Sequence, residues 1–301
     1  MTVNKLLILA QKKSQCSFYE SFDSFKSITI DYFSQVLSDL QILNPINIYS
    51  GYGQNSFVST GLEYYYDYLY NGMVISRNNT MVIQPSVRFK LNFFNSAYGN
   101  NDVMDFSSIA FNNLSIVHFE NELDRIVNIE NVLSFLSRIG IHASRVNFVL
   151  EYKIRQKNNN VSYTAVKFFV DNLEIGDILF LETNGIYLVE YGFGVERLFS
   201  RVLNKKYCDL FIENVKKYVN DEILAVNFLT LLNMFDNYNC NHGAKSKINF
   251  VLKTFNYNNV LLDLDLIFQN YEFWCKILEG TKYQVDFENV TQKYLKMVRR
   301  R

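Results

Sequence analysis

The chain has 301 residues, of which 49% are hydrophobic and 20% are charged, as in a globular protein with one large domain or two smaller ones. Thirty basic residues balance thirty acidic ones, which excludes the strongly basic character of a general nucleic-acid-binding protein. No stretch approaches the roughly 20 apolar residues of a membrane span, and the apolar run after Lys5 is too short for a secretory signal. We therefore expect a cytoplasmic protein without a membrane partner.

Cysteine usage points to the same compartment. The four cysteines are scattered along the sequence and form no CxxC pair: Cys16, Cys208, Cys240 and Cys275. Such spacing favours reduced thiols over a disulfide framework or a zinc site.

The first part of the chain combines helical and extended patterns. Apolar residues three or four apart predict a helix over 17–43, and a second helical segment is expected over 60–70. Alternation predicts a strand over 81–94, with Arg88 near its middle, and a returning strand over 114–119.

The middle part of the chain is richer in strands. A helix is expected over 128–139, with Gly140 at its C-terminal stop. Extended patterns predict four more strands, at 146–154, 163–169, 174–182 and 186–191. Together these elements predict an α+β fold, with a mostly antiparallel sheet of about six strands and helices on one face.

The pattern changes after Arg197, where nearly every segment has a helical period. This change predicts two domains, a sheet-containing domain over 1–204 and an all-helical domain over 205–301.

Segment 173–197 carries the strongest functional signal. It contains four acids, two glycines and an arginine: Glu174, Asp177, Glu182, Glu190, Gly192, Gly194 and Arg197. A glycine-spaced turn before a helix lets the backbone approach an anion, and an arginine can bind phosphate oxygens with two parallel hydrogen bonds. Acids beside such a turn could bind an amino group next to a triphosphate. A plain strand-to-helix turn with solvated acids is the open alternative.

Residues Val189 to Arg197, V-E-Y-G-F-G-V-E-R, resemble motif 3 of the class II aminoacyl-tRNA synthetases. The resemblance is closest to the alanyl enzymes, with V-D-T-G-M-G-L-E-R, and extends to the glycyl α-subunit, with V-E-I-T-Y-G-L-E-R. Residues Ile83 to Phe89, I-Q-P-S-V-R-F, are similar to the first motif 2 strand of both groups. The matches are collinear over roughly residues 80–260 and imply a class II catalytic core over 1–204.

The chain also departs from that family. Residues Phe111 to Ser115 stand where the alanyl enzymes carry R-H-H-T-F-F-E. The family's W-x-x-G-x-x-G-P-C-G-P-C-x-E loop and its editing domain have no counterpart. The resemblance is thus to a truncated paralogue.

The resemblance implies roles for individual residues. Arg88 and Arg197 would grip ATP as catalytic residues, Gly192 and Gly194 would line the ATP site, and Glu190 would pair with the amino group of the amino acid. Neutral residues of the family become Asp177 and Glu182, which with Glu174 would make the amino-acid site more acidic.

Such acids need cations, because like charges raise one another's pKa. Mg²⁺, held by Glu182 and arriving with ATP, is one candidate, and a second amino group on a diamino substrate is another. Alternation puts Glu174 and Glu182 on one face of their strand and Asp177 on the other, unless a bulge at Gly176 re-aims it.

Two functions follow from these observations. The first is an enzyme that joins an amino acid to ATP, forming an aminoacyl-adenylate and releasing pyrophosphate, with transfer to tRNA or to a carrier or small-molecule acceptor. The alternative is a degenerate synthetase that binds an amino acid or nucleotide as a regulator or partner subunit. ATP and Mg²⁺ are the expected cofactors, and the expected partners are the amino acid, the acceptor and a second copy in a homodimer.

Overall fold

The computed structural model describes residues 18–46, 58, 60–65, 69, 77–87, 110–122, 124–154, 162–183, 186–204, 246, 292 and 296. The chain divides into two compact units. One comprises 1–43, 60–83 and 112–206, and the other comprises 44–59, 84–111 and 207–301. The predicted helical domain over 205–301 falls almost wholly outside the described residues and stays a prediction.

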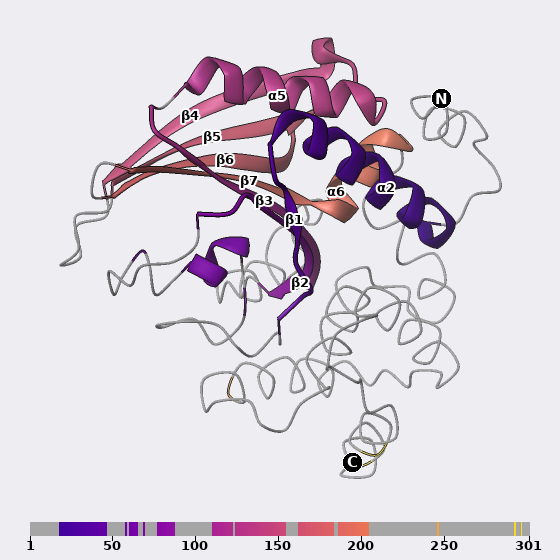
Figure 1. Cartoon of the computed structure of the whole chain (residues 1–301). Coiled ribbons are helices and arrows are strands. Elements are labelled where there is room, and N and C mark those ends of the chain that lie inside the picture. Colours follow the sequence, from indigo (N-terminus) through magenta and orange to yellow (C-terminus); the bar gives the residue numbers. More distant parts are fainter. Residues whose placement is uncertain are drawn as a thin grey trace. The chain divides into compact units, whose positions relative to one another are not determined.

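One seven-stranded sheet organises the described part of the chain (Figure 1), in the order β1-β2-β3-β7-β6-β5-β4. The elements follow one another as α2 (Phe18–Val36), β1 (Gln41–Ile42), the 3-10 helix η1 (Gly61–Tyr65), β2 (Thr80–Val87), β3 (Ala110–Glu120), α5 (Arg125–Arg138), the 3-10 helix η3 (Ala143–Arg145), β4 (Val146–Ile154), β5 (Ser162–Val170), β6 (Leu173–Thr183), β7 (Ile186–Gly194) and α6 (Val195–Val202). β1 runs parallel to β2, whereas the pairs β3–β7, β7–β6, β6–β5 and β5–β4 are antiparallel.

The predicted α+β class, with a mostly antiparallel sheet, is confirmed. β4 has the predicted bounds, and β3, β5, β6 and β7 extend beyond theirs. The strand expected over 81–94 is seen as β2 up to Val87, and the residues after it lie outside the described part of the chain. The helix expected over 17–43 ends at Val36, because Asp39 has a φ of 52° and the short strand β1 follows. The segment expected over 60–70 begins as the 3-10 helix η1.

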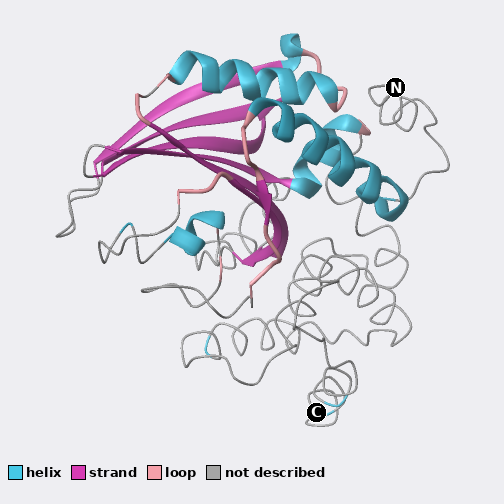
Figure 2. Cartoon of the chain, in the orientation of Figure 1, coloured by secondary structure: helices cyan, strands magenta, loops and turns pink. Residues whose placement is uncertain are grey.

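Helices α2 and α5 cover one face of the sheet (Figure 2). Phe33 of α2 lies 5.7 Å from Tyr191 between ring centroids, and Phe135 of α5 lies 5.7 Å from Phe193. Phe33 and Phe135 also contact each other at 5.0 Å. These four rings are fully buried, and burial of aromatic side chains of this size dominates the free energy of a core.

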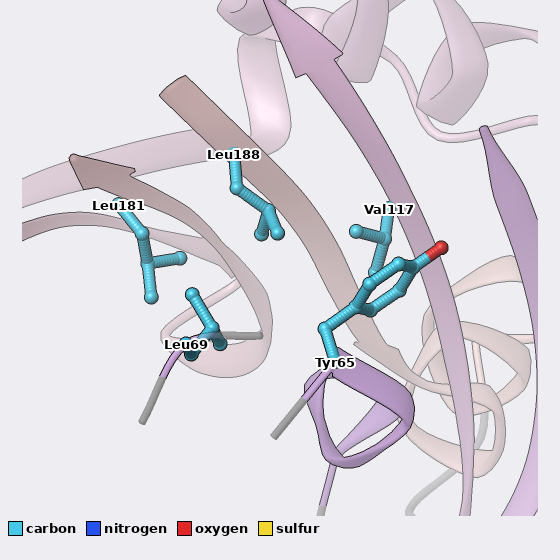
Figure 3. Close-up of a cluster of buried hydrophobic side chains, with 5 residues drawn as sticks. All are labelled: Tyr65, Leu69, Val117, Leu181 and Leu188. Carbon is cyan, nitrogen blue, oxygen red and sulfur yellow. The ribbon is translucent and has the colours of Figure 1, made fainter. Parts of the chain in front are cut away.

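The opposite face carries a second cluster around η1 (Figure 3). Tyr65 and Leu69 point toward Val117 of β3, Leu181 of β6 and Leu188 of β7, and all five side chains are buried. The Tyr65 hydroxyl lies 2.6 Å from the Thr80 hydroxyl, so this cluster also fixes η1 against β2. None of the helices in the described part of the chain is long and apolar enough to cross a membrane.

The helix α5 has both of its ends specified by sequence. The Asp124 carboxylate accepts hydrogen bonds from the backbone N–H groups of Ile126 and Val127 at 3.1 and 3.0 Å, as expected of an N-cap. Gly140 has a φ of 94° just after the helix, which confirms the predicted glycine stop.

A buried carboxylate attaches α6 to β3. Glu196, which is 4% exposed, accepts hydrogen bonds from the backbone N–H of Asn112 at 2.9 Å and from its side-chain amide at 2.7 Å. Burial raises the pKa of Glu196 to about 7, and the bonds from Asn112 oppose that rise. Glu196 therefore ties the start of α6 to β3, which is distant in sequence but pairs with β7 in the sheet.

The contact of β6 with β7 leaves no room for a side chain at Gly176. A Cβ atom on Gly176 would lie 2.2 Å from the carbonyl oxygen of Gly192 and 2.9 Å from the Cα of Phe193. A Cβ on Gly192 would meet only the Asp177 carboxylate oxygen, at 3.1 Å. The first contact involves backbone that cannot move aside, and the second involves the end of a side chain.

We predict that Gly176→Ala lowers the free energy of unfolding by roughly 1–3 kcal/mol, the usual cost of overpacking. Gly192→Ala should cost less, because a carboxylate can rotate away and alanine suits a strand better than glycine does. Urea unfolding of the two variants measures the difference, and equal losses would contradict the packing argument.

We predict that the pH dependence of stability changes when Glu196 is replaced by Gln. Because the folded state keeps the Glu196 proton from its ordinary pKa of 4.5 up to about 7, unfolding releases a proton in that window. The free energy of unfolding therefore falls as pH rises through it and levels off above pH about 7. Glutamine has no such proton, so Glu196→Gln should remove a contribution on the order of 3 kcal/mol between pH 4.5 and 8. Urea unfolding at both pH values gives this difference; parallel curves for the two proteins would exclude it.

Candidate active site

The two glycines of the predicted turn lie within a strand. β7 runs from Ile186 to Gly194, and α6 starts at the next residue. Neither Gly192 nor Gly194 has a positive φ, and Gly194 is extended with φ −77° and ψ 111°. The prediction of a glycine turn is therefore wrong. A Cβ at Gly192 or Gly194 would crowd a neighbouring side chain, that of Asp177 or Arg197 respectively.

Arg197 uses the space that Gly194 leaves. A Cβ on Gly194 would lie 3.2 Å from the Cδ of Arg197, so the arginine side chain folds back along the end of β7. Its Nη1 donates a hydrogen bond to the backbone carbonyl of Glu174 at 3.0 Å. The half-buried guanidinium is thus held between the first turn of α6 and the start of β6.

A bulge in β6 determines where its acids point. Phe169 lies opposite Glu174, but Phe168 lies opposite Gly176, so Ile175 is an extra residue in the strand. Directly paired residues project to the same face. Glu174 and Asp177 are therefore on one face, as expected of a bulged strand, although the extra residue is Ile175 and not Gly176.

The same register places Glu190 with these two acids. Gly192 lies opposite Asp177, and Glu190 lies opposite Leu179, two residues further along β6. Because residues two apart in a strand share a face, Glu174, Asp177 and Glu190 all project to the face of the sheet that carries η1.

Glu182 does not join this group. It lies five residues after Asp177 in regular β6 and is paired with Tyr187, so it projects to the opposite face. Its side chain is exposed. Of the four acids predicted to surround one site, the structure brings three to one face and leaves Glu182 out.

Glu190 is buried and held by two hydroxyl groups. Its side chain is 2% exposed, and its Oε1 accepts hydrogen bonds of 2.5 Å from both Thr60 and Ser115. Thr60 immediately precedes η1, and Ser115 is on β3. A Cβ on Gly61 would lie 2.1 Å from the Ser115 Oγ, so glycine is needed there to bring η1 onto β3.

The acidic face has a cation of its own. Lys167 of β5 lies opposite Asp177, and its Nζ is 2.9 Å from the Glu151 carboxylate of β4. The hydrogen bond that Lys167 donates to Glu151 raises the pKa of Lys167, and the charges of Glu174 and Asp177 add to the rise. Lys167 therefore stays protonated and balances part of the charge of the acids around it.

The remaining predicted residues are not placed by the structure. Arg88 lies outside the described residues. Over the described ranges, no three His, Cys, Asp or Glu side chains converge on a position for a metal ion. The Mg²⁺ assignment of Glu182 stays a prediction without support from the geometry.

Four residues of the site were not found from the sequence: Thr60, Gly61, Ser115 and Lys167. Lys167 is ten residues from Asp177, and only the β5–β6 register brings the two together. Ser115 lies in the segment that departs from the synthetase pattern. Alternation along β3 places it on the same face as Val117, which is the one signal that could have pointed to it.

No protein-family model and no curated protein matches this sequence. Among solved structures, the chain is similar to a pyrrolysyl-tRNA synthetase from Desulfitobacterium hafniense. The two share 12% sequence identity, and the match covers 62% of this chain and 70% of that chain, with a TM-score of 0.41. A likeness of this degree assigns no activity, so the functional argument depends on the residues of the site.

Proposed function

We propose that this chain is a class II synthetase-like ligase that activates an amino acid with ATP, forming an aminoacyl-adenylate and releasing pyrophosphate. The observation that carries the proposal is the junction of β7 and α6, where Arg197 is held by the backbone carbonyl of Glu174 while three acids of β6 and β7 project to one sheet face. Residues Val189 to Arg197 at this junction are also those that resemble motif 3 of the class II synthetases.

Arg197 is suited to bind phosphate. Its bond to the Glu174 carbonyl fixes the side chain, and the planar fork of a guanidinium matches the oxygens of a phosphate. Positioning and charge neutralisation supply most of the rate enhancement in reactions of this kind. Arg88 is proposed as the second arginine of the ATP site, on the resemblance alone.

Glu190 is the proposed partner of the substrate's amino group. The hydroxyls of Thr60 and Ser115 bind one of its oxygens, Oε1, and fix the direction of the carboxylate. An amino group that replaced the Thr60 hydroxyl would form a charge-assisted hydrogen bond, which is stronger than the neutral one it displaces.

The charge of the site bears on the substrate. The sequence suggests a diamino substrate because Glu174 and Asp177 require a cation. In the structure, Lys167 supplies one cation from within the chain. Because Lys167 also pairs with Glu151, it offsets only part of this charge, and a second amino group on the substrate is one way to balance the rest. We propose that the side chain of the amino acid meets Asp177 and Lys167 together, as a polar pair.

A binding or regulatory module is the second candidate, and the burial of Glu190 favours it. A carboxylate that is 2% exposed and already accepts two short hydrogen bonds can serve as a structural anchor. In that case the protein would bind an amino acid or a nucleotide without forming an adenylate. An acceptor, whether tRNA, a carrier or a small molecule, is needed only if the protein is the enzyme.

We predict that Arg197→Ala lowers amino-acid-dependent ATP–pyrophosphate exchange by roughly 10²-fold or more, since it removes a preorganised charge at the reacting phosphates. Arg197→Lys should be nearly as impaired, because lysine cannot make the bidentate contact. Arg201→Ala is the matched control on the same helix and should keep the wild-type rate.

The assay is run with each amino acid in turn, which also identifies the substrate. No exchange with any amino acid, together with saturable binding of ATP or an amino acid by calorimetry that Arg197→Ala abolishes, would favour the regulatory module. Equal exchange in Arg197→Ala and Arg201→Ala would exclude the proposed role of Arg197.

We predict that Glu190→Gln raises the KM for the amino acid by at least about 10-fold, because it replaces a charged partner of the amino group by a neutral one, and leaves the KM for ATP unchanged. Glu182→Gln is the matched control, since Glu182 projects to the other face of the sheet. Steady-state exchange kinetics measure both constants. A rise in the amino-acid KM of Glu182→Gln equal to that of Glu190→Gln would contradict the placement of the site.

A further inference from the structure

The strand β4 forms one margin of the sheet (Figure 1). In the strand order it is the terminal strand next to β5, and β5 is its one partner among the described strands. The outer backbone groups of such a strand are a template for pairing with another chain, and proteins commonly block them with proline, lysine or a covering segment.

The centre of β4 is apolar and exposed on both faces. Phe148, Val149 and Leu150 are 53%, 53% and 65% exposed. Consecutive strand residues point to opposite faces, so this exposure belongs to the edge itself rather than to one face. On the neighbouring strand, by contrast, Val166 and Phe168 are buried. Three consecutive exposed apolar residues at a strand edge favour association.

The sequence of β4 is complementary to itself in one register. Two copies related by a two-fold axis pair antiparallel, with one residue opposite its own counterpart. Centred on Val149, that pairing places Phe148 opposite Leu150 of the second copy, and places Val149 opposite Val149. It also places Asn147 opposite Glu151, an amide donor facing a carboxylate acceptor.

Neighbouring registers are less favourable. Centring on Glu151 places two carboxylates opposite each other, which destabilises an antiparallel pair. Centring on Leu150 places Val149 opposite the charged Glu151. Centring on Phe148 places Val149 opposite Asn147. The Val149 register is the one of these four that matches the exposed apolar residues with one another.

We propose that β4 is a self-association edge, at which the β4 of a second copy of this chain pairs antiparallel, centred on Val149, and joins the two sheets into one. The pairing fills the outer hydrogen bonds of β4 and covers the exposed side chains of Phe148, Val149 and Leu150. The sequence leads us to expect a homodimer, and this proposal names the surface that would form it. The proposal does not depend on the proposed activity.

Two variants of the full chain test whether this edge associates. Sedimentation equilibrium should show a dimer for the wild type. Leu150→Lys should raise the dimer dissociation constant by at least about 10-fold. Ile126→Lys is the matched control, because Ile126 is 70% exposed on α5, and it should leave the constant unchanged. Both positions are exposed, so circular dichroism should report a folded protein in each case.

Cross-linking tests the register. Directly opposite residues of an antiparallel pair have Cα atoms about 4.5–5.5 Å apart, within reach of a disulfide. Val149→Cys should therefore give a covalent dimer under mild oxidation, whereas Phe148→Cys and Leu150→Cys alone should not exceed the wild type, whose four native cysteines set the background. A monomeric wild type, an unaffected Leu150→Lys dimer, or stronger cross-linking by Leu150→Cys than by Val149→Cys would each overturn the proposal.

Discussion

The described fold depends on two acidic side chains, Glu190 and Glu196, that are buried between β3 and the segment from β7 to α6. Removing a carboxylate from water costs several kcal/mol unless hydrogen bonds replace the lost hydration. β3 contributes to both replacements, through Ser115 for Glu190 and through Asn112 for Glu196. Thr60 adds the bond that brings η1 to Glu190. The hydrogen bonds that compensate for the lost hydration of these acids thus also hold η1, β3, β7 and α6 in position. They thereby position Arg197 as well.

The sequence predicts the elements of the fold well where apolar residues alternate strongly. The bounds of β4, 146–154, were predicted to the residue. The prediction failed at Gly192 and Gly194, since two glycines before a helix usually indicate a turn. Here each glycine makes room for a neighbouring side chain while the strand continues, and sequence spacing alone does not distinguish these two uses.

The candidate site was predicted in part. The acids and Arg197 were found because they are close in sequence, and three of the four acids share a face. Lys167 and Thr60 were missed because their proximity arises from strand pairing and from the packing of η1, which involve residues distant in the chain. Residues that neutralise or orient a charge need not be near it in sequence, so a list of nearby acids leaves out the lysine that offsets part of their charge.

The extra residue in β6 has a consequence for comparison with other proteins. The hairpin between β5 and β6 turns at Asp171 and Asn172, both with positive φ, and a regular ladder from that turn would place Lys167 opposite Gly176. Ile175 moves the pairing on by one residue, so Lys167 meets Asp177 instead. An ungapped alignment of β6 with a strand that lacks the bulge is therefore correct on only one side of Ile175. Such an alignment cannot match both Glu174 and Asp177 to the equivalent residues of a relative.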